Sequence, residues 1–327
     1  MIAQDSALVA GIAAYRRHPY WRNLDSPPAI WSECETRLLD YGGTGPTILF
    51  VPSLVNRAYI LDLAEDASFL RYLAARETHP LLLDWGWPGE VERSFTLTDY
   101  IAGRLERALG AIDGPVILVG YCMGGLLALA AALRVSRQVR ALALLATPWD
   151  FHAGNPEGAR SLSASLPLLE PMMQATGTLP IDALQMLFAI LDPFGVAEKY
   201  RGFAALDPHS ARARRFVALE DWLNDGVPLA APVARETLGQ WYGANAPARG
   251  TWRIAGLPVD PTRVTIPVLA SIPARDRLVP PASAAVLAAA IPHATIITPD
   301  TGHIGMIAGR SAEDALWQPF LNWTRSL

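Results

Sequence analysis

Residues 120–125 read GYCMGG, and they lie between an apolar run at 116–119 and an alanine- and leucine-rich run that begins after Cys122. The first run is rich in β-branched residues and predicts a strand, whereas the second predicts a helix. The spacing Gly-x-Cys-x-Gly is that of a nucleophile elbow, a tight strand-to-helix turn whose central residue is usually serine. The cysteine at its centre is therefore the first residue to explain.

The elbow requires small residues two positions before and after the nucleophile, because larger ones would collide across the turn. Gly120 and Gly124 meet that requirement. Cys122 would then stand above the N-terminus of the following helix, where the helix dipole and free backbone N–H groups favour an anion. Taken alone, the motif also fits a small buried apolar residue, which is what most free cysteines are.

Apolar runs typical of strands alternate with helical patterns in two blocks of the chain. Strands separated by helices indicate βαβ units and a parallel sheet covered on both faces, which is an α/β fold. The expected strands are 47–51, 80–84, 116–119, 141–145, 266–272 and 295–297, and the expected helices are 64–75, 98–112, 282–290 and 312–323.

The segment between the two blocks shows no such alternation. It is rich in proline and tryptophan and contains helical stretches at 181–191 and 211–223. A sheet interrupted by a mostly helical insertion predicts a core with a cap. The expected division is therefore a first core part at 1–147, a cap insertion at 148–262 and a second core part at 263–327. We expect this cap to be mobile, to cover Cys122 and to line the site with apolar residues (Phe188, Phe194, Trp222, Trp241).

The partners of Cys122 are predicted by their order along the chain. In folds with this elbow the acid follows a later strand and the histidine comes near the C-terminus. Asp276 follows the expected strand at 266–272, and His303 follows the strand at 295–297 in a loop before the last helix. Asp300 is the rival for the orienting acid, although we expect it to shape the histidine loop.

The oxyanion hole of this arrangement uses the N–H of the residue after the nucleophile, here Met123, and a second N–H from the loop after an earlier strand. Ser53 and Leu54 are the candidates in that loop, and packing under the cap is the alternative explanation for either. The remaining histidines are expected to lie outside the site: His18, His79 and His293 in solvated loops, and His152 and His209 in the cap.

These residues resemble the polyhydroxyalkanoate synthases, a family with an α/β-hydrolase fold. The likeness covers most of the core, from about residue 47 to 310, and is weaker in the insertion and the N-terminus. It is carried by GYCMGG, VPSLVNRAYILDL (51–63), LLLDWGWP (81–88), ATPWDF (146–151), ARDRLVPP (274–281) and TGHIGMIAG (301–309).

The resemblance implies an acyltransferase that polymerises 3-hydroxyacyl-CoA with release of CoA through a covalent thioester. It places the triad on Cys122, Asp276 and His303. Acyl-CoA is then a substrate, and no cofactor or metal is implied. The short chain is similar to forms that work with a second synthase subunit or as a homodimer, and the family's product places the protein at the surface of a polymer granule.

Two departures from the family pattern stand out. Arg277 replaces the histidine that usually follows the acid, and the cap differs in LPIDALQMLFAILDPF and LEDWLNDGVPL. Two other function classes stay open: a cysteine hydrolase of esters or thioesters with the same triad, and a catalytically silent subunit that binds granules or regulates a synthase.

The bulk composition excludes several other classes. The 327 residues are 51% hydrophobic and 18% charged with a net charge of −4, so no electrostatic footprint for nucleic acid is present. The two cysteines, Cys34 and Cys122, lack disulfide or zinc spacing, which predicts a reducing, cytoplasmic setting.

The N-terminal residues do not have the pattern of a signal peptide. Residues 115–133 are long and apolar enough for a membrane span, but their glycines favour strand, turn and helix.

Overall fold

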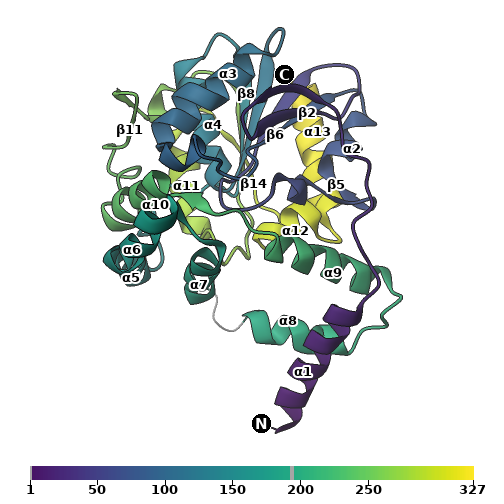
Figure 1. The fold of residues 1–327 in the computed structure, drawn as a ribbon. Coiled ribbons are helices and arrows are strands. Elements are labelled where there is room, and N and C mark those ends of the chain that lie inside the picture. The colour runs from purple at the N-terminus through teal and green to yellow at the C-terminus, as the bar shows by residue number, and fades with distance from the viewer. Residues whose placement is uncertain (1, 192–194) are drawn as a thin grey trace.

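A sheet of eight strands, counted over the residues that the structure describes, forms the centre of the molecule. The structure is a computed structural model that describes residues 2–191 and 195–327 (Figure 1). The strand order is β1-β2-β6-β3-β7-β8-β13-β14. Its members are β1 (Ala29–Glu33), β2 (Thr36–Asp40), β3 (Thr47–Val51), β6 (His79–Asp84), β7 (Val116–Tyr121), β8 (Val139–Leu145), β13 (Val268–Ser271) and β14 (Thr295–Ile297).

From β6 to β14 in this order, neighbouring strands are parallel. β2 pairs antiparallel with β6, and β1 pairs antiparallel with β2 at the edge of the sheet. The predicted α/β class with a mostly parallel sheet is confirmed. Each expected strand is present at nearly its expected place, because a strand buried on both faces is a continuous apolar run.

Helices cover both faces of this sheet, and alternate residues of one strand show why. In β3, Leu49 and Val51 join the apolar cluster under one set of helices, whereas Ile48 and Phe50 join the cluster under the other. The first face is covered by η3 (Asp99–Leu105), α3 (Glu106–Gly110), α4 (Met123–Arg134) and α11 (Pro281–Ala290), and the second by α2 (Phe69–Ala74), α12 (His303–Ala308), η6 (Glu313–Trp317) and α13 (Gln318–Arg325).

The segment between β8 and β13 is mostly helical. The helices expected at 181–191 and 211–223 form α7 and α9. Figure 1 shows α7 and α9 along one end of the body, and α1 (Ile2–Arg17) packs beside α8. The helical elements are α5 (Pro156–Ala164), α6 (Leu166–Thr176), α7 (Ile181–Leu191), α8 (Gly195–Ala204), α9 (Ala211–Asn224), α10 (Ala231–Glu236), η4 (Thr237–Gly243) and η5 (Pro261–Arg263); two small hairpins pair β9 (Thr178–Leu179) with β10 (Leu229–Ala230) and β11 (Arg253–Ile254) with β12 (Leu257–Pro258).

The two expected tryptophans of this insertion pack into the large clusters, whereas Phe203 of α8 and Val217 of α9 belong to a separate small cluster. Trp241 and Trp222 are buried in the two large clusters that flank the sheet. Phe188 is half-buried, and Phe194 lies outside the described residues. The insertion is therefore packed onto the sheet domain through its tryptophans.

The helix expected at 64–75 is wrong in its first part. The segment begins instead with the short hairpin of β4 (Asp62–Ala64) and β5 (Ala67–Ser68), and α2 starts at Phe69. Ser68 caps the helix, since its hydroxyl accepts a hydrogen bond from the N–H of Arg71. The buried carboxylate of Asp62 lies 2.7 Å from Nε of Arg71 and 3.1 Å from Nη2 of Arg22. These long-range ion pairs hold the hairpin.

The structure adds elements that the sequence did not predict: α1, η1 (Ala58–Leu61), η2 (Glu92–Ser94), and the hairpin of β1 and β2. The side chain of Arg104 anchors this hairpin from η3. Its Nη1 lies 2.6 Å from the carbonyl of Glu33, 2.7 Å from Oγ1 of Thr36 and 2.9 Å from the carboxylate of Glu92. Because a distant arginine holds these strands in place, their own sequence shows little of the alternation that predicts a strand.

The apolar stretch at 115–133 forms β7, the Cys122 turn and α4, as its glycines predict. Over the part of the chain that the structure describes, no helix is both long and apolar enough to cross a membrane.

Candidate active site

Cys122 stands alone between the last residue of β7 and the first residue of α4. Its backbone has φ 56° and ψ −127°, a conformation that residues other than glycine seldom adopt. Its N–H donates to the carbonyl of Leu145 at 2.8 Å, which ties the turn to β8. The thiol lies where three apolar clusters of the core meet, and it is half-buried. The strained turn therefore presents the side chain at the carboxyl end of the sheet.

The glycines around Cys122 have no room for a side chain. A Cβ on Gly120 would lie 2.3 Å from the Cα of Gly125, and one on Gly124 would lie 2.1 Å from the carbonyl oxygen of Val51. A Cβ on Gly125 would lie 1.9 Å from Oγ1 of Thr147. The elbow spacing predicted the first two positions. The close approach of Thr147 to the third depends on packing against β8.

We expect Gly124→Ala to lower the free energy of unfolding by more than the ~1–3 kcal/mol typical of overpacking, because the collision is with backbone. Chemical denaturation of the variant measures this. Gly110→Ala is the matched control: nothing lies within 4 Å of its Cβ position. That change should leave stability equal or higher by up to about 1 kcal/mol. Equal stability of the two variants would contradict the tight elbow.

Asp276 and His303 lie side by side although they come from different loops. Nδ1 of His303 lies 2.6 Å from Oδ2 of Asp276, and both side chains are buried. The other carboxylate oxygen accepts hydrogen bonds from the N–H groups of Leu278 and Val279, each at 2.9 Å. Asp276 is thus locked in place with one oxygen aimed at the imidazole.

The structure places Asp276 where the sequence predicted it, but it places His303 differently. Asp276 does lie in the loop after β13, but His303 is not in a loop, since it is the first residue of the short helix α12. Asp300 lies away from the imidazole: its side chain is 85% exposed and pairs with Nε of Arg275 at 2.9 Å. Asp276, and not Asp300, is therefore the carboxylate that contacts His303.

The imidazole of His303 carries a raised pKa. Burial lowers this pKa, but the negative charge of Cys122 and the hydrogen bonds with Asp276 and Cys122 outweigh it and raise the pKa to about 10. The imidazole is therefore protonated at neutral pH and carries a proton that it can give to a leaving group.

Removal of the Cys122 charge should lower the pKa of His303. In Cys122→Ala, burial would still disfavour the imidazolium, and the Asp276 carboxylate alone would oppose it. We expect the His303 resonance of labelled protein to titrate near pH 10 in the wild type and at clearly lower pH in the variant. An unchanged titration would show that Cys122 is not what raises the pKa of His303.

The predicted oxyanion residues surround the elbow. Ser53, Leu54 and Met123 are all buried, and the backbone before Ser53 touches Gly124. Met123 is the first residue of α4, so its N–H has no partner inside the helix. Among the described residues, no acceptor is found for the N–H of Met123 or Leu54. The hydroxyl of Ser53 accepts from the N–H of Val55 at 3.4 Å, so Ser53 has a local structural contact.

The loop that carries Leu54 is held by the insertion. Asn56 forms a bridge with Gly226, and Arg57 pairs with Asp225 at 3.3 Å. Nε1 of Trp222 donates to the carbonyl of Arg57 at 2.8 Å. These contacts come from LEDWLNDGVPL, one of the two stretches in which the insertion is unusual.

Tyr121 is a site residue whose part the sequence did not reveal. Its ring lies 5.1 Å from that of His303, and its hydroxyl donates to the His303 carbonyl at 3.3 Å. Burial raises its pKa well above the usual range, with the charges of Cys122 and Asp276 adding to the effect. The neutral phenol therefore supports the first turn of α12.

The other histidines have partners elsewhere. His79 was expected in a solvated loop, which is wrong: it begins β6, and its Nε2 lies 2.8 Å from Asp40. His18 contacts the carbonyl of Pro208, whereas His209 and His293 are exposed. His152 lies in the insertion and donates from Nε2 to the carbonyl of Tyr242 at 2.8 Å.

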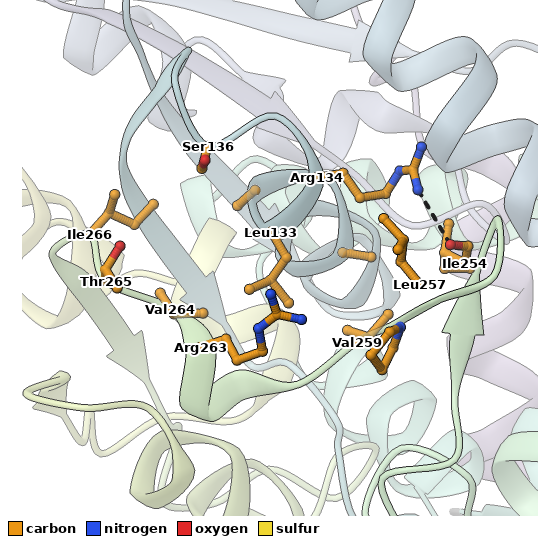
Figure 2. Close-up of a pocket in the computed structure, with 13 residues that line it drawn as sticks. Leu133, Arg134, Ser136, Ile254, Leu257, Val259, Arg263, Val264, Thr265 and Ile266 are labelled. Carbon is orange, nitrogen blue, oxygen red and sulfur yellow. Dashed lines mark hydrogen bonds between the residues drawn. The ribbon is translucent and has the colours of Figure 1, made fainter.

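A pocket of about 230 Å³ lies at the far end of α4 from Cys122. Figure 2 shows Leu133, Arg134, Val259 and Arg263 around it, with Arg134 bonded to the carbonyl of Ile254. Because its lining begins at Ala130 of α4, this pocket lies about 12 Å or more along the helix from Cys122. Its lining includes none of Cys122, Asp276 and His303. Within the described residues, no group of three or more His, Cys, Asp or Glu side chains is placed to hold a metal ion.

Comparison with known proteins agrees with this geometry. A family model described as the alpha/beta hydrolase family matches residues 48–315. The chain belongs to this family. A hydrolase from Oleispira antarctica shares the fold, with a TM-score of 0.57, 15% identity, and coverage of 89% of this chain and 94% of its own. The predicted α/β-hydrolase fold is confirmed.

Within this family, the sequence is similar to proteins named poly(3-hydroxyalkanoate) polymerase subunit PhaC. The relative from Haloferax mediterranei is 28% identical over 90% of this chain, and the one from Synechocystis sp. is 29% identical over 84%. The match spans 62% of the first relative's own length and 76% of the second's. The resemblance to polyhydroxyalkanoate synthases is thereby confirmed over most of the chain.

Proposed function

We propose that this protein takes 3-hydroxyacyl groups from CoA onto Cys122 and joins them into a polyester. The observation that carries the proposal is a cysteine at the elbow of an α/β-hydrolase fold, next to a buried Asp276–His303 pair. The names of its relatives support the same reaction.

In the first step, the Cys122 thiolate attacks the carbonyl carbon of the acyl-CoA thioester. The bond from that carbon to the CoA sulfur breaks, and the CoA thiolate takes the proton from His303. Asp276 holds the imidazole by Nδ1 and stabilises its charged form. The products are acyl-Cys122, free CoA and a neutral imidazole.

In the second step, His303 removes the proton from the 3-hydroxyl of another acyl unit. The alkoxide attacks the thioester carbon, an ester bond forms, and the carbon–sulfur bond to Cys122 breaks. A thioester exchanged for a thioester keeps most of its free energy, so the acyl group remains able to acylate an alcohol. A serine ester would lose that advantage, which explains why cysteine occupies the elbow.

The N–H groups of Met123 and Leu54 are the proposed donors to the oxyanion in both steps. They come from α4 and from the loop after β3, and the loop backbone touches the elbow at Gly124. One such donor contributes about 3 kcal/mol in comparable sites. The proposal gives Ser53 the part of shaping this loop through its bond to Val55.

The segment 148–262 acts as a cap over the thioester in this proposal. Trp241 from η4 is buried in the apolar cluster against which Cys122 packs. The same cluster includes Leu184 and Ala183 of α7. An apolar cover of this kind keeps water from the acyl-enzyme, while a half-buried Cys122 stays within reach of a substrate.

Acyl-CoA and the growing polyester are the proposed substrates, and no cofactor is assigned a part. The proposed setting is the cytoplasm at the surface of a polymer granule, with a second synthase subunit or a second copy of this chain as partner. Size measurement in solution, alone and with a synthase partner, tests the assembly separately from the chemistry.

Incubation with 3-hydroxybutyryl-CoA tests the reaction directly. We expect CoA thiol to appear together with oligomeric esters of 3-hydroxybutyrate, detected by mass spectrometry. Thiol release with free 3-hydroxybutyrate as the sole acyl product would replace the proposal by a cysteine hydrolase. No thiol release, alone or with a partner subunit, would favour a silent subunit.

A further inference from the structure

Tyr242 of η4 brings a phenol from the insertion to the surroundings of Cys122. Its ring packs edge-to-face against Phe151 with centroids 4.9 Å apart. Its carbonyl accepts the hydrogen bond from Nε2 of His152 at 2.8 Å. Both partners belong to the segment that follows β8, so the ring packs on the chain that leaves the strand beside β7.

The hydroxyl of Tyr242 has no partner of its own. It forms no hydrogen bond with any described residue, the thiol included, and it is not among the atoms sealed from solvent. Burial, followed by the negative charge of Cys122, raises the pKa of Tyr242 to about 12. The phenol is therefore a neutral donor within electrostatic range of the nucleophile. Tyr121 differs, because its hydroxyl is already bonded to the His303 carbonyl.

The strand order puts the segment on which Tyr242 packs on the other side of β7 from the loop of Leu54. β7 lies between β3 and β8. Leu54 comes from the loop after β3, whereas Phe151, on which Tyr242 packs, comes from the loop after β8. An acyl group on Cys122 that points its oxyanion at Leu54 sends its chain toward the other side. A lone polar group that faces a mostly apolar site is suited to fix substrate orientation.

We propose that the Tyr242 hydroxyl forms a hydrogen bond with the oxygen at C3 of the acyl chain on Cys122. It would thereby select 3-hydroxyacyl groups over plain acyl groups. This inference rests on the proposed acylation of Cys122 and adds the residue that recognises the substrate. Tyr242 is a specificity-determining residue, and the triad carries the chemistry.

The test compares two acyl donors in Tyr242→Phe, which keeps the ring and removes the oxygen. The rates of Cys122 acylation by 3-hydroxybutyryl-CoA and butyryl-CoA are measured in single turnover, with the adduct followed by intact mass. We expect the ratio of the two kcat/KM values to fall about tenfold or more, since a hydrogen bond to a buried group is lost. Tyr72→Phe is the matched control, because its hydroxyl bonds Gln318 on α13. It should keep the wild-type ratio.

An equal loss for both donors in Tyr242→Phe would overturn the inference, since it would show a structural part only, and so would an unchanged ratio. The 4-nitrophenyl esters of the same two acids give the ratio independently of CoA. If these esters acylate Cys122 but the CoA thioesters do not, the proposed function fails while Tyr242 is still judged by the ester ratio. A wild-type protein that no donor acylates would overturn both.

Discussion

Cys122→Ala is expected to form no acyl adduct and to release CoA from 3-hydroxybutyryl-CoA at a rate lower by up to about 10⁶-fold, the loss seen when a triad nucleophile is removed. The reason is geometric: the strained turn at Cys122 puts its sulfur at the end of β7, beside the buried His303. Intact-mass spectrometry followed by peptide mapping measures the adduct, and a thiol reagent measures CoA.

Cys34→Ala is the control, because Cys34 is the second cysteine of the chain and is exposed. This variant should keep the wild-type adduct and rate. An adduct that persists in Cys122→Ala, or one that maps to Cys34 alone, would refute the assignment of the nucleophile.

Asp276→Asn should lower kcat by about 10⁴, the effect of replacing the orienting carboxylate in comparable triads. The amide cannot accept the Nδ1 proton as the carboxylate does, so the imidazole would adopt the wrong tautomer for proton transfer. The hydrogen bonds from Leu278 and Val279 to Oδ1 remain available to the asparagine, so the fold should persist. Steady-state turnover with matched melting curves measures the effect.

Asp300→Asn is the partner experiment. Its side chain is exposed and paired with Arg275, and exposed ion pairs contribute little to stability. We expect near-normal turnover. The reverse result, a crippled Asp300→Asn beside an active Asp276→Asn, would reassign the orienting acid.

The residues of the site come both from the ends of the sheet strands and from the insertion. The proposed nucleophile, acid and base follow β7, β13 and β14, at the carboxyl edge of one sheet: Cys122 in a turn, Asp276 in a loop and His303 as the first residue of α12. The insertion supplies Tyr242 near the thiol and, through Trp222 and Asp225, holds the loop of Leu54. A movement of the insertion would therefore alter the oxyanion loop and the acyl side of the site together.

The sequence alone was sufficient for the elbow and the parallel sheet, and it favoured Asp276 over Asp300 as the partner of His303. Each rests on local information: Gly120 and Gly124 because a turn this tight excludes any Cβ, and the buried strands because they are continuous apolar runs. The order of Asp276 and His303 along the chain favoured this pair because parallel strands bring their carboxyl ends to one edge.

Only the tertiary structure decided the rest. Tyr242 lies 120 residues after Cys122, and no spacing predicts that a chain returning through several helices of the insertion will set it against Phe151. Likewise, the β4–β5 hairpin replaces an expected helix because Asp62 finds Arg22 and Arg71. Local propensity is weak, about 1 kcal/mol or less per residue. Burial and ion pairs between distant segments outweigh it, and these contacts exist only once the chain has folded.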